Sequence, residues 1–289
     1  MGFATLLAAI VALAAPHPLR DPTGLAFDAR GNLWVCNYSG RTVVEYGAAS
    51  IASSGAPAPV LTIQRIRGPN NVTFDRSGNL WVAEYDGGSI AEVRGARLVL
   101  RIRLPHDQFA APTGLAFDRT GTLWVTDQRS DRLYGYSPAQ LRAGGEKRPA
   151  RSIRLPGGVA ANNQSVAFDA SGRMWVVQYG RDRVLGFAGP SGRQVRALNV
   201  PGKGPLNVTP GRDGRLWLTL AGASELSTFT PAGPAVTFTS TSFANPHTIA
   251  FDPGGRLWTT QYSDQVLGFD REAFGAAGSV TPSIVIRNP

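Results

Sequence analysis

PTGLAFDRTGTLWV, residues 112–125, is the stretch that decides the fold, because it returns five more times in the chain. The other copies are PTGLAFDARGNLWV (22–35), PNNVTFDRSGNLWV (69–82), NQSVAFDASGRMWV (163–176), PLNVTPGRDGRLWL (205–218) and PHTIAFDPGGRLWT (246–259). Each copy carries one of the six tryptophans near its end, and successive copies lie roughly 40 to 50 residues apart. A repeat of this period is typical of a chain built from similar supersecondary units.

Within one unit, the residue pattern predicts four short strands. In the third copy, apolar and small residues alternate up to Phe117, and the Asp118–Gly121 segment has the composition of a tight turn. Further strands are expected at Leu123–Val125, Leu133–Tyr136 and Arg151–Leu155. The expected fourth strands of the other units are Val60–Ile66, Leu98–Leu104, Val195–Val200, Val236–Thr239 and Ile284–Arg287.

Four short strands per unit and six units predict an all-β fold, a six-bladed β-propeller with four antiparallel strands per blade around a central channel. We expect residues 16–289 to form this single domain. Each repeated tryptophan is expected to pack between neighbouring blades, and each repeated aspartate to cap a turn. The fifth copy has Gly211 in place of the aspartate, which indicates a degenerate blade that still keeps the ring closed.

Residues 1–15 favour a secretory signal peptide. Residues 3–15 form an apolar run too short to span a bilayer, and the run ends in an Ala-x-Ala-like site at residues 12–14. No Lys or Arg precedes the run, and a fourth-strand role in the first blade is the alternative. We expect a secreted, periplasmic or cell-envelope protein. The single cysteine, Cys36, has no partner for an internal disulfide and decides neither alternative.

The chain is basic, with a formal net charge of +9 and a pI near 10.4. Arginine pairs recur on or beside the expected fourth strands, at Arg65/Arg67, Arg101/Arg103 and Arg151/Arg154. One interpretation is solvated charge that protects sheet edges; the other is a basic rim that binds an anionic polymer. Binding of single-stranded RNA on that face is a weaker alternative, against which export argues. We expect a monomer without a transmembrane segment and do not expect nucleic acid as the partner.

The repeated motif resembles the NHL-type repeat over nearly the whole chain, from about Pro22 to Arg287. It also resembles blades of the gluconolactonase/regucalcin-like lactonases and of the virginiamycin B lyases. These resemblances imply the six-bladed architecture. They are weak evidence for an activity, because one fold hosts many functions.

Two rings of candidate residues are predicted around the channel mouth. One ring follows the first residue of each inner strand and includes Asn70, Asn71, Gln164, Asn207 and His247. The other follows each tryptophan by three residues, and the tyrosines come one step later: Asn37, Glu84, Asp127, Gln178 and Gln261, with Tyr38, Tyr85, Tyr179 and Tyr262. Such a mouth suits a small polar ligand or a hard cation such as calcium, for which Glu84 and Asp127 are the candidate ligands. The alternative is a channel whose amides bind only water.

The enzyme resemblances imply residues that this chain carries only in part. A gluconolactonase-type metal site implies a Glu and an Asp at inner-strand starts, where this chain offers amides. A streptogramin-lyase site implies a His together with a Glu-x-His pair; His247 matches the first, and no Glu-x-His occurs. We therefore expect a propeller that binds a small polar ligand or a protein partner. The alternative is a lactonase-like hydrolase or a lyase acting on a small cyclic ester, with His247 as the candidate catalytic residue.

Overall fold

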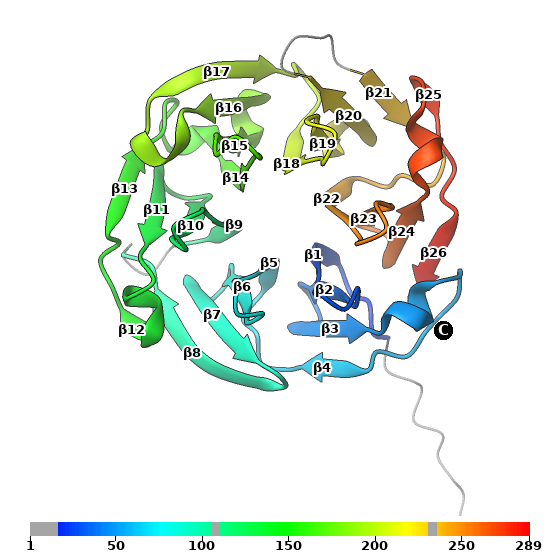
Figure 1. Cartoon of the computed structure of the whole chain (residues 1–289), viewed down its shortest axis with the longest axis horizontal. Helices are drawn as coiled ribbons and strands as arrows, with labels where there is room; N and C mark the ends of the chain where they lie inside the picture. The colour runs from blue at the N-terminus through cyan, green and yellow to red at the C-terminus, as the bar shows by residue number, and fades with distance from the viewer. Residues whose placement is uncertain (1–16, 106–109, 231–235) are drawn as a thin grey trace, which may run out of the picture.

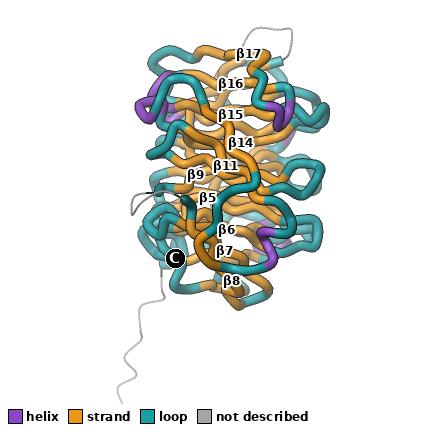
Figure 2. The backbone as a smooth tube through the Cα atoms, turned by 90° about the vertical axis from the view of Figure 1, so that its left-hand side faces the viewer, coloured by secondary structure: helices purple, strands orange, loops and turns teal. Residues whose placement is uncertain are grey.

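The computed structural model describes residues 17–105, 110–230 and 236–289, and it confirms the predicted architecture. Six antiparallel sheets stand as blades around a central axis (Figure 1). Figure 2 shows the strands between two faces that carry the loops and the short helices. The expected signal peptide at residues 1–15 lies outside the described residues.

The blades follow one another in chain order, and each contributes four strands from the axis outward. The innermost strands are β1 (Pro22–Phe27), β5 (Pro69–Phe74), β9 (Pro112–Phe117), β14 (Asn163–Phe168), β18 (Pro205–Pro210) and β22 (Pro246–Phe251). The second strands are β2 (Leu33–Asn37), β6 (Leu80–Glu84), β10 (Leu123–Asp127), β15 (Met174–Gln178), β19 (Leu216–Leu220) and β23 (Leu257–Gln261).

The third and fourth strands form the outer half of each blade, and the fourth strands are the more exposed. The third strands are β3 (Thr42–Tyr46), β7 (Ser89–Arg94), β11 (Arg132–Tyr136), β16 (Arg183–Phe187), β20 (Glu225–Phe229) and β24 (Gln265–Phe269). The fourth strands are β4 (Leu61–Ile63), β8 (Arg97–Arg103), β13 (Arg151–Arg154), β17 (Gln194–Asn199), β21 (Val236–Thr239) and β26 (Ile284–Arg287). Single-turn 3-10 helices are η1 (Ala48–Ile51), η2 (Gln140–Arg142), η3 (Val159–Ala161), η4 (Tyr179–Arg181), η5 (Gly189–Ser191), η6 (Ala221–Ala223) and η7 (Arg271–Phe274).

The inner strands pack side by side around the axis, and β22 contacts β1 to close the ring. Closure also uses the chain ends: Leu19 N donates to Asn288 Oδ1 at 2.9 Å, and Asn288 Nδ2 donates to the Leu19 carbonyl at 2.8 Å. Gly24 shows how tight the inner wall is. A Cβ at this position would lie 2.5 Å from the Cα of Asn71, so only glycine allows β1 and β5 to approach this closely.

Three blades receive an additional edge contact from the following blade, which the sequence did not predict. The loop before β13 forms β12 (Gly145–Glu146), which pairs in parallel with β8 of the second blade. Before β26, β25 (Gly278–Ser279) pairs in parallel with β21 of the fifth blade. Gly55 forms the corresponding bridge from the first blade to Ile286 of the sixth. These contacts cover exposed strand edges and tie neighbouring blades together at the rim.

Each repeated tryptophan packs between its own blade and the next, as predicted. Trp124 of the third blade lies in one buried cluster with Val166 and Met174 of the fourth. Trp258 of the sixth blade packs in the same way with Leu25 of the first. Burial of a large aromatic side chain against apolar neighbours therefore stabilises every seam of the ring.

The repeated aspartates cap turns, as predicted, and they also bind the tryptophans. Asp118 Oδ1 accepts the backbone N–H groups of Thr120 and Thr122 at 2.8 and 3.0 Å. Its Oδ2 accepts the indole N–H of Trp124 at 2.9 Å. The same indole bond joins Asp28, Asp75, Asp169 and Asp252 to the tryptophans of their own blades. One side chain thus fixes both the turn and the aromatic ring that seals the next blade.

Candidate functional site

Antiparallel pairing of the two inner strands brings both candidate rings to one face of the propeller. In the first blade, Pro22 at the start of β1 pairs with Asn37 at the end of β2, whereas Phe27 pairs with Leu33 at the opposite face. The same arrangement holds in the other blades. This face, where the inner strands begin, is called the channel mouth below.

The channel mouth carries the four predicted tyrosines. Tyr38 and Tyr85 are half-buried, and Tyr179 and Tyr262 are 39% and 55% exposed. The equivalent positions of the third and fifth blades hold Gln128 and Ala221. A cavity of about 340 Å³ opens among Gln128, Asn162, Gln164, Tyr179, Leu206, Ala221, Gly222, Asn245 and Tyr262. It combines aromatic faces, amides and a small apolar patch from Leu206 and Ala221.

One side of the rim is ordered by aromatic and charged contacts. The rings of Tyr38 and Tyr85 meet edge to face with centroids 6.0 Å apart, and the Arg129 guanidinium lies 5.7 Å from the Tyr85 centroid. Tyr38 donates its hydroxyl proton to Asp86 Oδ1 at 2.9 Å. Burial and then this hydrogen bond raise the pKa of Tyr38 to about 12, so the phenol remains protonated at neutral pH.

His247 stands on β22 beside Tyr262, and it is 8% exposed. The two ring centroids are 5.8 Å apart, and His247 Nδ1 lies 3.2 Å from the hydroxyl of Thr248. Burial lowers the pKa of His247 to about 4, which leaves the imidazole neutral at physiological pH. Nε2 has no hydrogen-bond partner among the described residues and is not one of the fully shielded polar atoms. The imidazole is therefore neutral, with one ring nitrogen next to Thr248 and the other unbonded among the described residues.

Tyr262 supplies the complementary donor next to this imidazole. Burial is the largest cause that raises the pKa of Tyr262. The charge of Asp21 and the phenols of Tyr179 and Tyr85 raise it further. The hydroxyl thus stays protonated and can donate to a ligand oxygen. Tyr179 of the fourth blade and Tyr262 of the sixth line the same cavity.

The remaining residues of the first predicted ring differ in whether their side chains already make hydrogen bonds within the protein. Asn70 and Asn71 are half-buried on β5, and their side chains make no hydrogen bond among the described residues. Gln164 lines the cavity and donates to Asn162 Oδ1. Asn207 is engaged on both sides: its amide donates to Ser165 Oγ, and its Oδ1 accepts from Thr209 Oγ1 and from Ile249 N. It joins the fourth, fifth and sixth blades and is not available to a ligand.

The second ring lies at this face, but its side chains are buried in the blades and do not line the mouth as expected. Asn37, Glu84, Asp127, Gln178 and Gln261 are at most 1% exposed. Four of them accept a backbone N–H from the segment that enters their own blade, donated by Arg20, Arg67, Ala111 and Ala244. A buried backbone donor outside a strand needs such an acceptor, and this need accounts for a polar residue at the end of β2, β6, β10 and β23.

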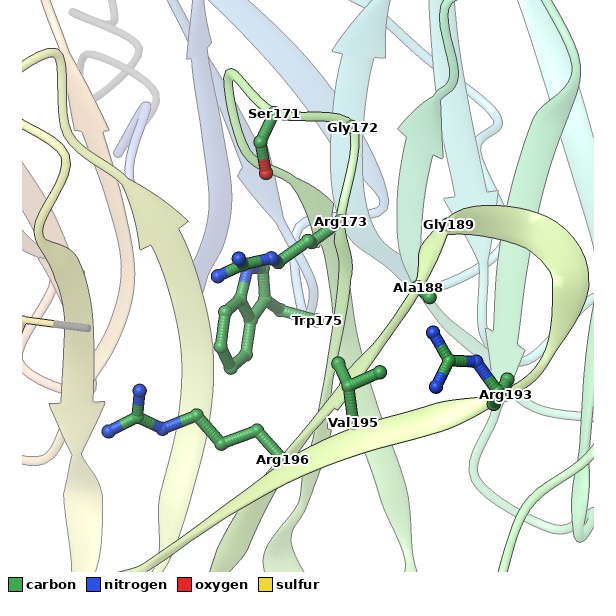
Figure 3. Close-up of a pocket in the computed structure, with 9 residues that line it drawn as sticks. All are labelled: Ser171, Gly172, Arg173, Trp175, Ala188, Gly189, Arg193, Val195 and Arg196. Atoms are coloured by element: carbon green, nitrogen blue, oxygen red, sulfur yellow. The ribbon is translucent and has the colours of Figure 1, made fainter. Parts of the chain in front are cut away.

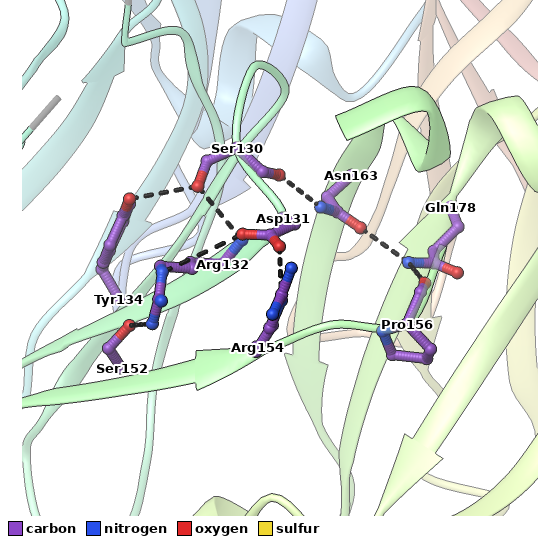
Figure 4. Close-up of polar contacts among 9 residues, drawn as sticks. All are labelled: Ser130, Asp131, Arg132, Tyr134, Ser152, Arg154, Pro156, Asn163 and Gln178. Atoms are coloured by element: carbon purple, nitrogen blue, oxygen red, sulfur yellow. Dashed lines mark hydrogen bonds and ion pairs between the residues drawn. The ribbon is translucent and has the colours of Figure 1, made fainter. Parts of the chain in front are cut away.

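Gln178 also fixes the segment that enters its blade, but it does so as a hydrogen-bond donor and not as an acceptor (Figure 4). Its amide donates to the Pro156 carbonyl and to Asn163 Oδ1, both at 2.9 Å. Asn163 in turn donates to the Ser130 carbonyl of the third blade at 2.9 Å. Gln178 therefore anchors the entry of the fourth blade and, through Asn163, its contact with the third.

The donor set at the channel mouth does not fit a hard divalent cation. Glu84 is neutralised by Arg101, whose Nε and Nη2 donate to its two carboxylate oxygens at 2.7 and 2.9 Å. Asp127 is wholly buried, and its Oδ2 has no partner among the described residues. No group of three or more His, Cys, Asp or Glu side chains is arranged to hold a metal in the described part of the chain.

The arginines of the expected basic rim are partly paired. Arg101 belongs to Glu84, and Arg154 Nε donates to Asp131 Oδ2 at 2.7 Å. Arg65, Arg67, Arg103 and Arg151 are exposed on or beside the fourth strands. Binding of an anionic polymer there stays a prediction, as does export. Within the described ranges, no helix has the length and apolar character needed to cross a membrane.

Comparison with known families now gives the chain its place. The family model described as the SMP-30/gluconolactonase/LRE-like region matches residues 64–222. The chain belongs to this family. A search of curated proteins gave no match.

Several solved structures resemble this family member in fold, with little sequence identity. A streptogramin B lyase matches with a TM-score of 0.68 and 15% identity, covering 89% of this chain and 82% of that one. A catalytically inactive virginiamycin B lyase from Staphylococcus aureus, solved with quinupristin, matches with a TM-score of 0.66 and 17% identity, covering 93% and 84%. A gluconolactonase from Xanthomonas campestris matches with a TM-score of 0.63 and 19% identity, covering 85% and 84%. At these identities, the likeness shows the fold.

Sequence reasoning missed several residues of the mouth. Gln128, Asn162 and Asn245 line the cavity although only Gln128 lies at a repeat position next to the named rings. Asn162 has a φ of 51° and Asn245 of 50°, so each sits in the left-handed region just before its inner strand. An asparagine directly before the strand was the available signal, since asparagine tolerates this conformation better than most residues.

Proposed function

We propose that this family member is an enzyme that opens a small cyclic ester at the channel mouth, by hydrolysis or by elimination. The observation that carries the proposal is the pairing of His247 with Tyr262: a neutral imidazole stands beside a protonated phenol, and this phenol lines a cavity of about 340 Å³. This volume lies within the range of small-molecule pockets. Membership of a lactonase-containing family and the likeness to lyase structures support the same class.

The two side chains offer complementary roles. Tyr262 can donate a hydrogen bond to the ester carbonyl oxygen and stabilise the negative charge that develops on it. When Nδ1 carries the ring proton and donates it to Thr248 Oγ1, His247 Nε2 can accept a proton, either from a water that attacks the carbonyl or from the carbon adjacent to the one that bears the leaving oxygen. In hydrolysis, the carbonyl-to-oxygen bond breaks and the proton passes to the leaving alkoxide. In elimination, the bond between the leaving oxygen and its alkyl carbon breaks, and the oxygen departs as part of a carboxylate. The product gains a carbon–carbon double bond, and the proton passes from His247 to solvent.

The test is an activity panel of sugar lactones and cyclic depsipeptides with wild type and His247→Gln. We expect wild type to open one class and the variant to lose at least a hundredfold in kcat, the usual contribution of a general base. Mass spectrometry separates the two reactions, because hydrolysis adds the mass of one water and elimination adds none. Equal turnover by wild type and variant would refute the role of His247.

A ligand-binding module without catalysis is the second candidate. It is favoured because both buried carboxylates are already engaged: Glu84 is bound to Arg101, and Asp127 accepts the backbone N–H of Ala111. His247 is then left without an acidic partner. Under this alternative, a compound of the panel raises the melting temperature and is recovered unchanged.

A further inference from the structure

The fifth blade breaks the aspartate–tryptophan rule of the other blades. Trp217 is 4% exposed, and its indole Nε1 is buried without a hydrogen-bond partner among the described residues. In the other blades an aspartate Oδ2 accepts this proton, but here Gly211 stands in the aspartate's place. An unmet buried donor is costly, so it marks a position where an acceptor would bind favourably.

Asp213 takes over only one of the two roles of the missing aspartate, the capping of the turn. Its Oδ1 accepts the backbone N–H of Arg215 at 3.1 Å, as Asp169 Oδ1 accepts that of Arg173 in the fourth blade. The indole of Trp217 is left unbonded by this arrangement. The turn is therefore capped, and the aromatic ring is not.

A cavity of about 470 Å³ opens at this indole, on the face opposite the channel mouth. Its apolar lining includes Trp217, Phe251, Leu257 and Phe274. Arg212, Arg215 and Arg271 also line it, against a single carboxylate from Asp213. Arg271 has no ion-pair partner among the described residues. The lining thus combines aromatic surface, an unmet N–H donor and an excess of positive charge.

The corresponding cavity of the fourth blade provides an internal comparison (Figure 3). It has a volume of about 690 Å³ and is lined by Trp175 with Arg173, Arg193 and Arg196. Figure 3 shows the Arg173 side chain beside the indole of Trp175. Asp169 accepts the indole proton there at 3.0 Å, so positive charge is present and the unmet donor is not. The fifth blade alone joins the two features among the blades described.

We infer that the cavity of the fifth blade binds the carboxylate of a small apolar or aromatic acid. The carboxylate takes the position of the missing aspartate side chain, accepts the indole proton of Trp217 and lies among the arginines, while the apolar body packs on Phe251 and Phe274. A carboxylate accepts such hydrogen bonds more strongly than a neutral group does. This second site is separate from the proposed reaction site at the mouth.

Asp213 controls access to this position. Its Oδ1 lies 2.5 Å from where a Cβ of residue 211 would be, and Trp217 Nε1 lies 3.0 Å from the same point. The Asp213 side chain is 40% exposed, so it can turn toward solvent when a ligand enters. Replacing it with serine removes both the obstruction and the competing negative charge, and serine or threonine occupies this position in the second, third and fourth blades.

The experiment compares two variants that differ only at residue 211. Asp213→Ser leaves the indole of Trp217 without a carboxylate acceptor. Asp213→Ser combined with Gly211→Asp gives residues 211–214 the Asp-Arg-Ser-Gly sequence of the turn at residues 75–78. The probe is 3-phenylpropionate, followed by tryptophan fluorescence and by melting temperature. We expect wild type to bind, Asp213→Ser to bind more tightly, and the double variant to bind at least about tenfold more weakly than Asp213→Ser. The neutral amide of the same acid should not bind to any of them.

Two matched controls separate the site from general attraction of anions. Arg271→Gln should weaken binding several-fold, whereas Arg193→Gln removes the same charge from the fourth-blade cavity and should leave binding unchanged. The inference is overturned if Asp213→Ser and the double variant bind equally, if the amide binds as well as the acid, or if neither wild type nor Asp213→Ser binds. Without ligand, the double variant should melt at a higher temperature than Asp213→Ser. This result would confirm that it folds with the indole bond restored.

Discussion

Trp124 donates its indole proton to Asp118 Oδ2 at 2.9 Å, and this bond couples the turn of the third blade to the packing of the fourth. Both side chains belong to the repeated motif, so five blades are held in the same way. Five of the six seams therefore depend on one such residue pair each, and the fifth blade lacks it.

Replacing the seam tryptophan is expected to destabilise the whole ring. Trp124→Ala removes a fully buried side chain and should lower the free energy of unfolding by about 3–5 kcal/mol. Chemical denaturation measures the change. Val99→Ala, at a position 48% exposed, is the control and should change it by less than about 0.5 kcal/mol. An unchanged midpoint for Trp124→Ala would contradict the seam role.

Acid should weaken the turns at an unusually low pH. Burial raises the pKa of Asp75, Asp118 and Asp169, but their hydrogen bonds lower it more, and the net pKa lies below the usual aspartate value. Their stabilisation is complete above the ordinary aspartate pKa near about 4 and is lost as the pH falls through the lowered values. Melting temperatures between pH 2 and 7 should show this loss, and Asp118→Asn should reduce its size.

The Glu84–Arg101 pair is expected to be structural. Glu84→Gln leaves the guanidinium of Arg101 without its carboxylate and should cost about 3 kcal/mol of folding free energy. Glu225→Gln breaks the more exposed pair with Lys203 and should cost less than about 1 kcal/mol. If Glu84→Gln instead leaves stability intact and abolishes ligand binding, Glu84 belongs to the site.

His247 should contribute to the pH dependence of stability at a higher pH than the aspartates, between about pH 4 and pH 6.5. Its pKa of about 4 in the folded protein lies below the ordinary histidine value of 6.5, so the unfolded chain binds the extra proton first. Stability from this group is complete above about pH 6.5 and declines until about pH 4. Subtracting the profile of His247→Gln isolates this decline. NMR titration of the imidazole with a midpoint near 6.5 would contradict the buried, neutral state.

Metal chelation should have no effect on the protein. The described residues at the channel mouth offer amides and no free carboxylate pair, so EDTA is expected to leave the melting temperature and any lactone-opening activity unchanged. Addition of calcium, magnesium, manganese or zinc should likewise cause no shift. A shift reversed by EDTA would show a cation site and would require another arrangement of Asn70 and Asn71.

Much of the fold follows from the repeat, because period, turn residues and tryptophan position are all local features. The fourth strands were predicted to within a few residues. β12 and β25 were not, since Gly145–Glu146 and Gly278–Ser279 are too short to carry a strand pattern. Their pairing depends on a neighbouring blade that brings a free edge close.

The candidate site was predictable only in part. The tyrosines and His247 lie at the mouth as expected, because the ring geometry fixes where β2 ends and β22 begins. Asn37, Glu84, Asp127 and Gln261 end their strands at the same face but are buried, since each accepts a backbone N–H of the entering segment. No sequence pattern reports that donor. Gly211 was visible as a lost aspartate, whereas the unmet indole of Trp217 required the structure.

The most direct test of the proposed reaction site is a crystal structure of the His247→Gln variant with a cyclic ester that wild type opens. The account predicts the ester at the channel mouth, with its carbonyl oxygen within hydrogen-bond distance of the Tyr262 hydroxyl and its scissile bond facing residue 247. An ester bound at the opposite face, or at the rim away from Tyr262, would contradict it.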